Sequence, residues 1–147
     1  MNYETRKVMF SSQDGRWRTP QDLFDLLDSE FHFHVDVCAD LNHKLRSDLT
    51  NWIHEYGLSI PWSNMRCYMN PPYGREITKW VGKAWYEMYA NNALTVALLP
   101  CRTDTNWFWA YCINQEIRLI KGRVRFLNDD KDELPAPFPS MIVVFKP

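Results

Sequence analysis

The chain contains no long apolar run. None of its segments comes near the roughly 20 consecutive apolar residues that a membrane-spanning helix needs. Met1 is followed by polar and charged residues, so the start of the sequence does not have the pattern of a secretory signal either. We therefore expect a soluble, intracellular protein that makes no membrane contact.

Cysteine is sparse and scattered. The four cysteines include no Cys-x-x-Cys pair, and no histidine stands at a ligand spacing from any of them. This pattern argues against a zinc site and against a disulfide framework, and it fits small buried thiols in a reducing compartment. The four histidines form no catalytic triad and no ligand pattern, so we predict that no metal is bound.

An excess of charge of one sign is also lacking. The chain has 17 basic and 18 acidic residues and a net charge of −1, so any contact with DNA must come from a local basic patch. Aromatic residues, by contrast, make up 15% of the chain, a surplus that often includes rings kept for stacking on ligands. With 147 residues, 46% of them hydrophobic, the sequence predicts a single substantial core.

The apolar pattern predicts alternating strands and helices. A helix is expected to open at Pro20 with Thr19 as its N-cap. Segment 94–99 is apolar throughout, as a parallel strand buried on both faces is. The other expected elements are strands at 34–39, 66–69, within 116–126 and at 140–145, helices near 45–53, at 76–89 and at 104–112 with a cap near Thr103, and a surface loop at 127–139.

This order predicts an α/β fold with a mostly parallel sheet, covered by helices on both faces and closed by an antiparallel final strand. Residues 1–18 are polar and lack a period, so they are expected to form an N-terminal arm. Residues 19–147 are expected to form one domain, since no internal repeat or second apolar cluster is present.

The most informative segment is Asn70-Pro71-Pro72-Tyr73, which follows the predicted strand at 66–69 and precedes Gly74. The prolines make the tetrapeptide extended and stiff, so the Asn70 amide oxygen and the Pro71 carbonyl can both accept hydrogen bonds from one planar amino group. The Tyr73 ring can cover a base that enters the site. A target base inside a duplex can enter only by flipping out of the helix. A plain Pro-Pro turn is the alternative reading.

Two further strand ends carry polar residues, at 36–40 and at 100–104. Ligands of open α/β sheets bind beyond the carboxyl ends of the strands, which favours an active site there. Asp36 could equally be a turn acid, and the segment Arg102 to Thr105 could simply cap the helix that follows. Arginines and lysines near these ends could contact phosphates or form a solvated face: Arg75, Lys79, Lys83, Arg118, Lys121, Arg123 and Arg125.

Several segments, taken in order, resemble the small phage DNA N6-adenine methyltransferases known as the Dam-like family. The matching segments are Trp17-Arg18-Thr19-Pro20, Asp36-Val37-Cys38-Ala39, Asn70-Pro71-Pro72-Tyr73-Gly74, 99–105 with Trp107-Phe108, and Gly122-Arg123-Val124-Arg125-Phe126. The resemblance implies a Rossmann-like methyltransferase fold, S-adenosylmethionine as methyl donor, and adenine in DNA as acceptor. It also implies a phage or prophage gene that acts in the cytoplasm of a bacterial host.

The resemblance assigns roles to particular residues. Asn70, Pro71, Pro72 and Tyr73 would be catalytic. Cofactor contacts would come from Thr19, Pro20, Asp36, Cys38, Ala39 and Asn70, and substrate contacts from Tyr73, Arg75, Arg102, Asp104 and Arg123. The glycine-rich cofactor loop usual in such enzymes is replaced here by Cys38-Ala39-Asp40. Three acids remain candidates for the ribose hydroxyls of the cofactor: Asp40, Asp48 and Glu55.

Alternatives remain open at this stage. Cytosine N4, adenine in RNA and protein glutamine also present an amide-like NH2 group, so the tetrapeptide fits them as well. A non-catalytic relic that binds DNA or cofactor is a second class, although an intact tetrapeptide speaks against it. Sequence recognition could come from loops such as 41–64 and 127–139, or from a second subunit, including a homodimer partner.

Overall fold

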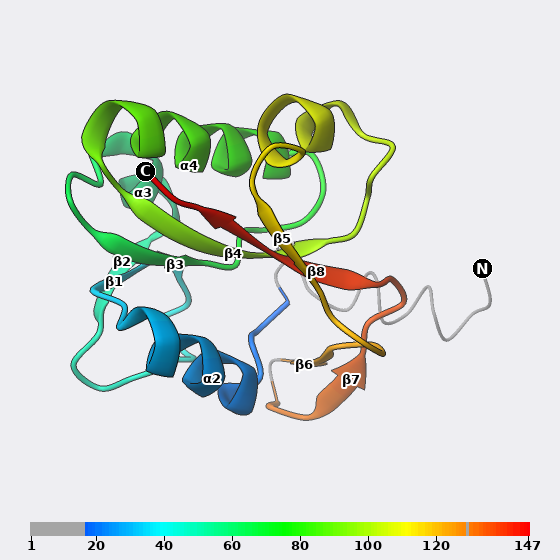
Figure 1. Cartoon of the computed structure of the whole chain (residues 1–147). Coiled ribbons are helices and arrows are strands. Elements are labelled where there is room, and N and C mark those ends of the chain that lie inside the picture. The colour runs from blue at the N-terminus through cyan, green and yellow to red at the C-terminus, as the bar shows by residue number, and fades with distance from the viewer. Residues whose placement is uncertain (1–16, 129) are drawn as a thin grey trace.

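A mixed sheet of six strands forms the centre of the protein, as a computed structural model of residues 17–128 and 130–147 shows (Figure 1). The strand order is β2-β1-β3-β4-β8-β5, and a separate two-stranded hairpin is formed by β6 and β7. The strands are β1 Val35–Ala39, β2 Thr50–Ile53, β3 Arg66–Met69, β4 Leu94–Pro100, β5 Glu116–Leu119, β6 Arg125–Leu127, β7 Glu133–Pro135 and β8 Ser140–Phe145. The helices are α2 Gln21–Phe31, α3 His54–Ser59, α4 Ile77–Asn91 and the π-helix η1 Phe108–Cys112.

Helical layers cover the sheet on both faces. In Figure 1, α3, α4 and η1 lie above the sheet, and α2 lies below it. Strands β1 to β4 pair in parallel, whereas β8 runs antiparallel to both β4 and β5. The predicted α/β architecture, with its mainly parallel sheet and antiparallel final strand, is confirmed.

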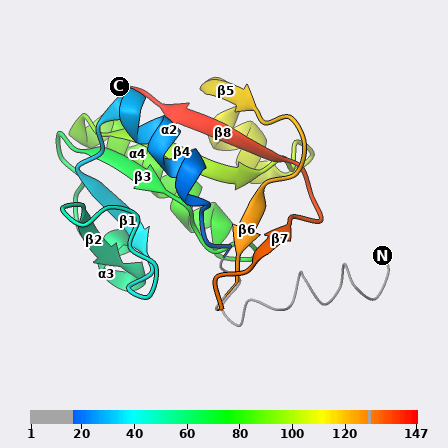
Figure 2. The same ribbon diagram turned by 90° about the horizontal axis from the view of Figure 1, so that it is seen from below.

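The sheet has a topological switch point between β1 and β3. From β1 the chain moves outward to β2, and it then crosses back over α3 to β3 on the other side of β1. Open α/β sheets bind ligands at such a point, beyond the carboxyl ends of the two strands. The hairpin β6–β7 leaves the sheet at this same edge, because it connects the end of β5 to the start of β8. Figure 2 shows the start of α2 close to β6.

Two expectations for the connecting segments are wrong. The helix expected near 45–53 is the edge strand β2 followed by α3, and the loop expected at 127–139 contains β7, which pairs with β6. Strand β2 has only β1 beside it, and its residues are half-buried or exposed. Its sequence therefore lacks the apolar run by which the central strands are recognised.

Two expected helix caps also differ. Helix α2 begins at Gln21 after Pro20, and no side chain caps it, because the Thr19 hydroxyl bonds elsewhere. The segment expected as a helix at 104–112 ends in the π-helix η1, in which Ile113 N donates to Phe108 O. Here Thr105 accepts from Phe108 N, while Thr103 uses its carbonyl to bind the Trp109 indole.

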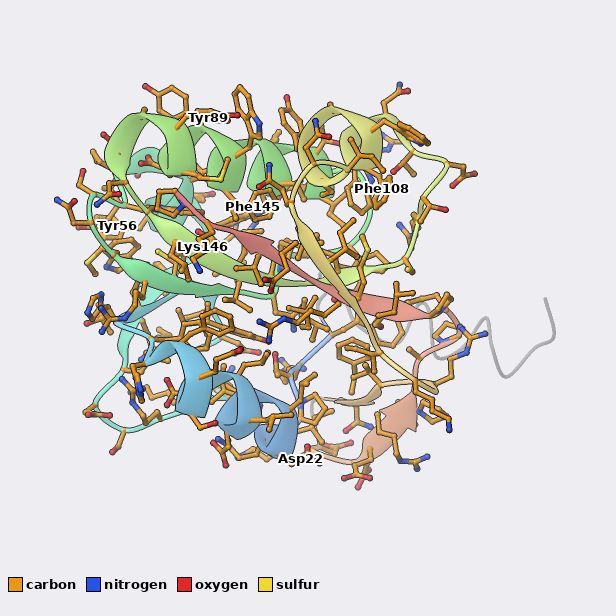
Figure 3. The ribbon with its side chains drawn as sticks, viewed as in Figure 1. Asp22, Tyr56, Tyr89, Phe108, Phe145 and Lys146 are labelled. Carbon is orange, nitrogen blue, oxygen red and sulfur yellow. The ribbon has the colours of Figure 1, made fainter. Side chains whose placement is uncertain are left out.

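The core lies between the sheet and its helical layers. Strands β1 and β8 are buried at every residue, and α4 turns an apolar stripe to the sheet, as its helical spacing predicts. Figure 3 shows Phe145 between β8 and α4, with Tyr89 on the outer side of α4. No helix in residues 17–128 and 130–147 is long and apolar enough to cross a membrane.

Helix α3 approaches β1 so closely that only glycine fits at position 57. A Cβ atom there would stand 1.9 Å from the backbone oxygen of Val37. We expect Gly57→Ala to lower the free energy of unfolding by roughly 3 kcal/mol, since backbone must move to relieve the clash. In the matched variant Gly82→Ala the new atom meets only the side chain of Tyr111, at 3.3 Å, so the change should stay within about 1 kcal/mol. Urea denaturation of both variants tests this, and equal stabilities would contradict it.

Burial makes folding stability sensitive to alkaline pH through Cys67. Desolvation raises the pKa of this thiol from 9.0 to about 12. The unfolded chain therefore releases the thiol proton first as pH rises above 9, and the stabilising contribution is lost between pH 9 and about 12. At about pH 10.5, Cys67→Ala should have lost roughly 2 kcal/mol less of its pH 8 stability than the wild type has. Denaturation curves at both pH values measure the difference, and identical pH slopes would contradict the explanation.

Candidate functional site

A small pocket opens at the switch point between the ends of β1 and β3. It has a volume of about 30 Å³ and is lined by Trp17, Arg18, Thr19, Asp36, Cys38, Asp40, His43, Leu45, Tyr68 and Asn70. Along β3, Tyr68 and Asn70 are two residues apart and so point to the same face of the sheet. We call this the switch-point pocket. It brings together four of the residues assigned to the site from the sequence: Thr19, Asp36, Cys38 and Asn70.

The segment Trp17–Arg18–Thr19, which we call the strap, covers this pocket. Its middle residue is tied on two sides: Arg18 Nε lies 2.6 Å from Asp40 Oδ2, and Arg18 O accepts a hydrogen bond of 3.0 Å from Leu127 N on β6. The Trp17 ring packs against Phe126 and Phe138, with centroid distances of 5.6 and 5.5 Å. The sequence predicts an arm at 1–18, of which residues 1–16 lie outside the described residues. The other two, Trp17 and Arg18, make the contacts just given.

Asn70 binds the strap with its amide nitrogen. Nδ2 donates to the carbonyl of Trp17 and, over 3.1 Å, to Oγ1 of Thr19. The other end of the amide, Oδ1, is buried and accepts no hydrogen bond within the described part of the chain. A buried acceptor without a partner costs about 1–3 kcal/mol, so such an atom calls for a functional explanation.

The turn continues after Asn70 with three buried residues, Pro71, Pro72 and Tyr73. The Tyr73 hydroxyl donates to the backbone oxygen of Leu98 over 2.9 Å, and burial raises the pKa of this phenol well above its usual value. Gly74 follows with φ +119°, a conformation that other residues rarely adopt, and it lets the chain turn into α4.

The Tyr73 ring is enclosed in this structure. It packs edge-on against Phe126 and Phe138, at centroid distances of 6.2 and 5.7 Å, and only 9% of the residue is exposed. Together with Trp17 these rings form one aromatic cluster beside Asn70. A base could reach the Tyr73 face only after this cluster opens, so its stacking role stays a prediction.

Asp36 lies inside β1 and not at the strand end expected from the sequence. Its Oδ1 accepts a hydrogen bond of 3.2 Å from Cys38 N, and its side chain still faces the switch-point pocket because Asp36 and Cys38 point the same way along the strand. Pro20, half-buried, leads into α2, where its carbonyl accepts from Phe24 N.

A second pocket lies where β1 and β2 end, and we call it the outer pocket. Its volume is about 340 Å³, and its lining residues are Ala39, Asp40, Leu41, Ile53, His54 and Glu55. Asp40 lines both pockets, so the two are neighbours. Of the three candidate acids, Glu55 and Asp40 therefore lie at this edge. Asp48 precedes β2, at the opposite edge of the sheet, and pairs with Arg46 at 2.6 Å.

The residues assigned to substrate contact are spread around the site. Arg102 is half-buried, and its guanidinium lies 5.8 Å from the Phe138 ring centroid. Arg75, Asp104 and Arg123 are exposed and do not line the switch-point pocket.

Two of the three arginines at 118–125 that were expected as possible phosphate contacts are paired with carboxylates. Arg118 binds Glu30 and Glu116, and Arg125 binds Glu133. The third, Arg123, forms no ion pair with the described residues.

Sequence reasoning assigned no role to Tyr68, His43 or Phe138, although all three belong to the site. Tyr68 could have been found from the strand period, because it stands two residues before Asn70. His43, which contacts the carbonyl of Thr19 at 2.9 Å, and Phe138 reach the site from loops, for which the sequence carries no such signal. Within the described ranges, no group of three or more His, Cys, Asp or Glu side chains gathers as a metal site.

Two comparisons with known proteins show the family of the chain. The family model described as DNA N-6-adenine-methyltransferase (Dam) matches residues 7–147. The DNA N-6-adenine-methyltransferase of Haemophilus phage HP1 (strain HP1c1) is 28% identical over 151 residues, which cover 97% of this chain and 85% of the phage protein. The chain thus belongs to the Dam family of DNA N-6-adenine methyltransferases.

Proposed function

We propose that this DNA N6-adenine methyltransferase takes its methyl group from S-adenosylmethionine, and that Asn70 and Pro71 hold the adenine amino group that receives it. The observation that carries the proposal is the buried Asn70 Oδ1, which accepts no hydrogen bond from the described residues. This acceptor stands at the switch point, where the fold places ligands.

The proposed role of Asn70 follows from the chemistry of the adenine amino group. The N6 lone pair is delocalised into the ring, so the nitrogen is a poor nucleophile. If Asn70 Oδ1 and the Pro71 carbonyl accept its two N–H bonds, the nitrogen is drawn toward the tetrahedral geometry from which it can attack a methyl group. This is electrostatic preorganisation, and it requires no general base before methyl transfer.

We propose that the two neighbouring pockets take a nucleoside cofactor with an amino-acid tail, for which the switch-point pocket, at about 30 Å³, would have to widen by movement of the strap. S-adenosylmethionine would supply a methyl group on a positively charged sulfur. The adenine nitrogen would attack the methyl carbon, and the sulfur would leave with the electrons of the broken C–S bond. We propose that Asp36, Cys38 and Thr19 in the switch-point pocket hold the methionine end. The outer pocket, at about 340 Å³, is in the size range of small-molecule sites, and Ala39 is among its lining residues.

The proposed ribose-binding acid is Glu55. Asp40 is already occupied, since Arg18 binds its Oδ2 and Asn42 N donates to its Oδ1 over 2.9 Å. Glu55 is exposed in the first turn of α3, and no ion pair to it is seen among the described residues. The order of the central strands around the switch point supports a Rossmann-like methyltransferase fold for this arrangement.

Adenine in DNA reaches this site only after it has left the duplex. The aromatic cluster of Trp17, Tyr73, Phe126 and Phe138 would then open to receive the base, because it encloses the Tyr73 face. We propose that Arg75, Arg102 and Arg123, at the same edge of the sheet, contact phosphates, with Asp104 on the loop beside them. The predicted homodimer and the recognition loops stay predictions.

Replacing the acceptor tests the proposed role of Asn70 directly. We expect Asn70→Ala to lower the methyl-transfer rate on DNA at least 100-fold, the usual size of an electrostatic contact made in the transition state. Single-turnover transfer of a labelled methyl group gives the rate, and calorimetry shows whether cofactor binding is retained. The control is Asn114→Ala, an exposed amide at the opposite edge of the sheet. Undiminished transfer in Asn70→Ala would contradict the mechanism.

Cofactor binding tests the assignment of the ribose acid. Glu55→Gln should weaken S-adenosylmethionine binding about tenfold, because a charged acceptor is replaced by a neutral one at a cost of roughly 1.4 kcal/mol. Asp48→Asn removes the same charge at the far edge of the sheet and should leave the affinity unchanged. Isothermal titration calorimetry measures both variants. If the two variants bind equally well, the ribose hydroxyls are held by another residue.

A further inference from the structure

We propose that Thr19 and Tyr68 are positioning residues that fix which end of the Asn70 amide faces the substrate. Neither would touch the reacting atoms. They would act through the hydrogen bond that Thr19 makes to Asn70, so the proposal rests on the function proposed above for Asn70. It adds to the cofactor contact proposed for Thr19 a second role, the support of the substrate acceptor.

The three side chains form a chain of hydrogen bonds that is part-buried at Asn70 and buried at Thr19 and Tyr68. Asn70 Nδ2 donates to Thr19 Oγ1 over 3.1 Å, and Thr19 Oγ1 lies 2.6 Å from the hydroxyl of Tyr68. Thr19 is 2% exposed and Tyr68 is fully buried. Water is therefore excluded from the bond between Thr19 and Tyr68, which strengthens it, while the bond between Asn70 and Thr19 is part-buried.

An asparagine amide can sit in either of two orientations, because its oxygen and its NH2 group have nearly the same shape. Only one orientation serves the proposed chemistry, since an NH2 group facing the adenine amino group would oppose donor to donor. In the structure both N–H bonds of Nδ2 have acceptors, the Trp17 carbonyl and Thr19 Oγ1. Turning the amide over would place its oxygen against these two oxygens and lose both bonds, so Oδ1 is kept on the substrate side.

Tyr68 would determine the role of the Thr19 hydroxyl. A hydroxyl has one hydrogen and can either donate it or accept, depending on how it rotates. With its hydrogen directed at the Tyr68 oxygen, Thr19 presents a lone pair to Asn70. Either hydroxyl can donate in the bond between Thr19 and Tyr68, and in both cases a lone pair of Thr19 Oγ1 is left to accept from Asn70. Without Tyr68 the Thr19 hydrogen could rotate toward Asn70 and favour the reversed amide.

The first test is the methyl-transfer rate. Thr19→Val keeps the shape of the side chain and removes the acceptor, so the single-turnover rate should fall about 10- to 100-fold, as expected for roughly 1.4 to 2.7 kcal/mol. Thr19→Ser keeps the hydroxyl and should return the rate to within about threefold of the wild type. Tyr68→Phe should cause a smaller loss than Thr19→Val. The matched control is Thr95→Val, a buried threonine on β4 outside the site.

The second test separates positioning from a loss of structure. Two duplexes are compared, with adenine or with purine at a position that the enzyme methylates. They differ only in the amino group, so the ratio of their dissociation constants reports the hydrogen bond from that group to Asn70. We expect Thr19→Val to reduce the preference for adenine about tenfold compared with wild type, with S-adenosylhomocysteine present. An equal weakening of both duplexes would mean that Thr19 is merely structural, and an unchanged transfer rate would overturn the proposal outright.

The third test does not depend on activity. The side-chain N–H protons of Asn70 should exchange slowly with water in the wild type and in Thr19→Ser, and at least one of them should exchange faster in Thr19→Val. Nuclear magnetic resonance of labelled protein measures this, and equal exchange in all three proteins would refute the proposed amide contact. If the wild type does not transfer methyl groups from S-adenosylmethionine to DNA, the proposed function is what fails, while the exchange measurement still decides the role of Thr19.

Discussion

The parallel pairing of β1 with β3 is the constraint on which the site depends. With Asp36 aligned to Tyr68, the two strands end at the same edge, and the chain continues from β1 to β2 on one side and from β3 to β4 on the other. The edge between them is therefore uncovered by helices, and it is there that Asp40 and Asn70 approach the strap. A change of register would turn Asp36 and Tyr68 to the other face and remove the pocket.

Stability and chemistry draw on different parts of the molecule. The apolar strands β1, β4 and β8 and the buried face of α4 carry the folding free energy. The edge beyond them contains groups that folding alone does not favour, above all the buried Asn70 oxygen, which accepts no hydrogen bond from the described residues. A protein can keep such a group when the surrounding core compensates its cost, and functional sites are where this is expected.

Local patterns of the sequence predicted most of the core and the position of the tetrapeptide. The central strands are continuous apolar runs, and Asn70-Pro71-Pro72-Tyr73 is stiff enough to be interpreted without its surroundings. What could not be predicted depends on contacts between distant residues. Thr19 meets Tyr68 and Asn70 across about 50 positions, and this contact, not helix capping, decides what its hydroxyl does. Likewise β2 is recognisable only once β1 lies beside it, and the enclosure of Tyr73 comes from rings on the β6–β7 side.

The strap joins two parts of the protein that the chain itself keeps far apart. Through the carboxylate of Asp40 it is anchored to the pocket edge, and through Leu127 it makes an isolated antiparallel bridge to the hairpin. If the proposed cofactor binds under the strap, a displacement of the hairpin by a bound duplex would move the cover of the switch-point pocket, and the bound cofactor would in turn bias the position of the hairpin. Such linkage is reciprocal by thermodynamic necessity. The two ligands of this enzyme would then not bind independently, and the three residues of the strap would couple their affinities.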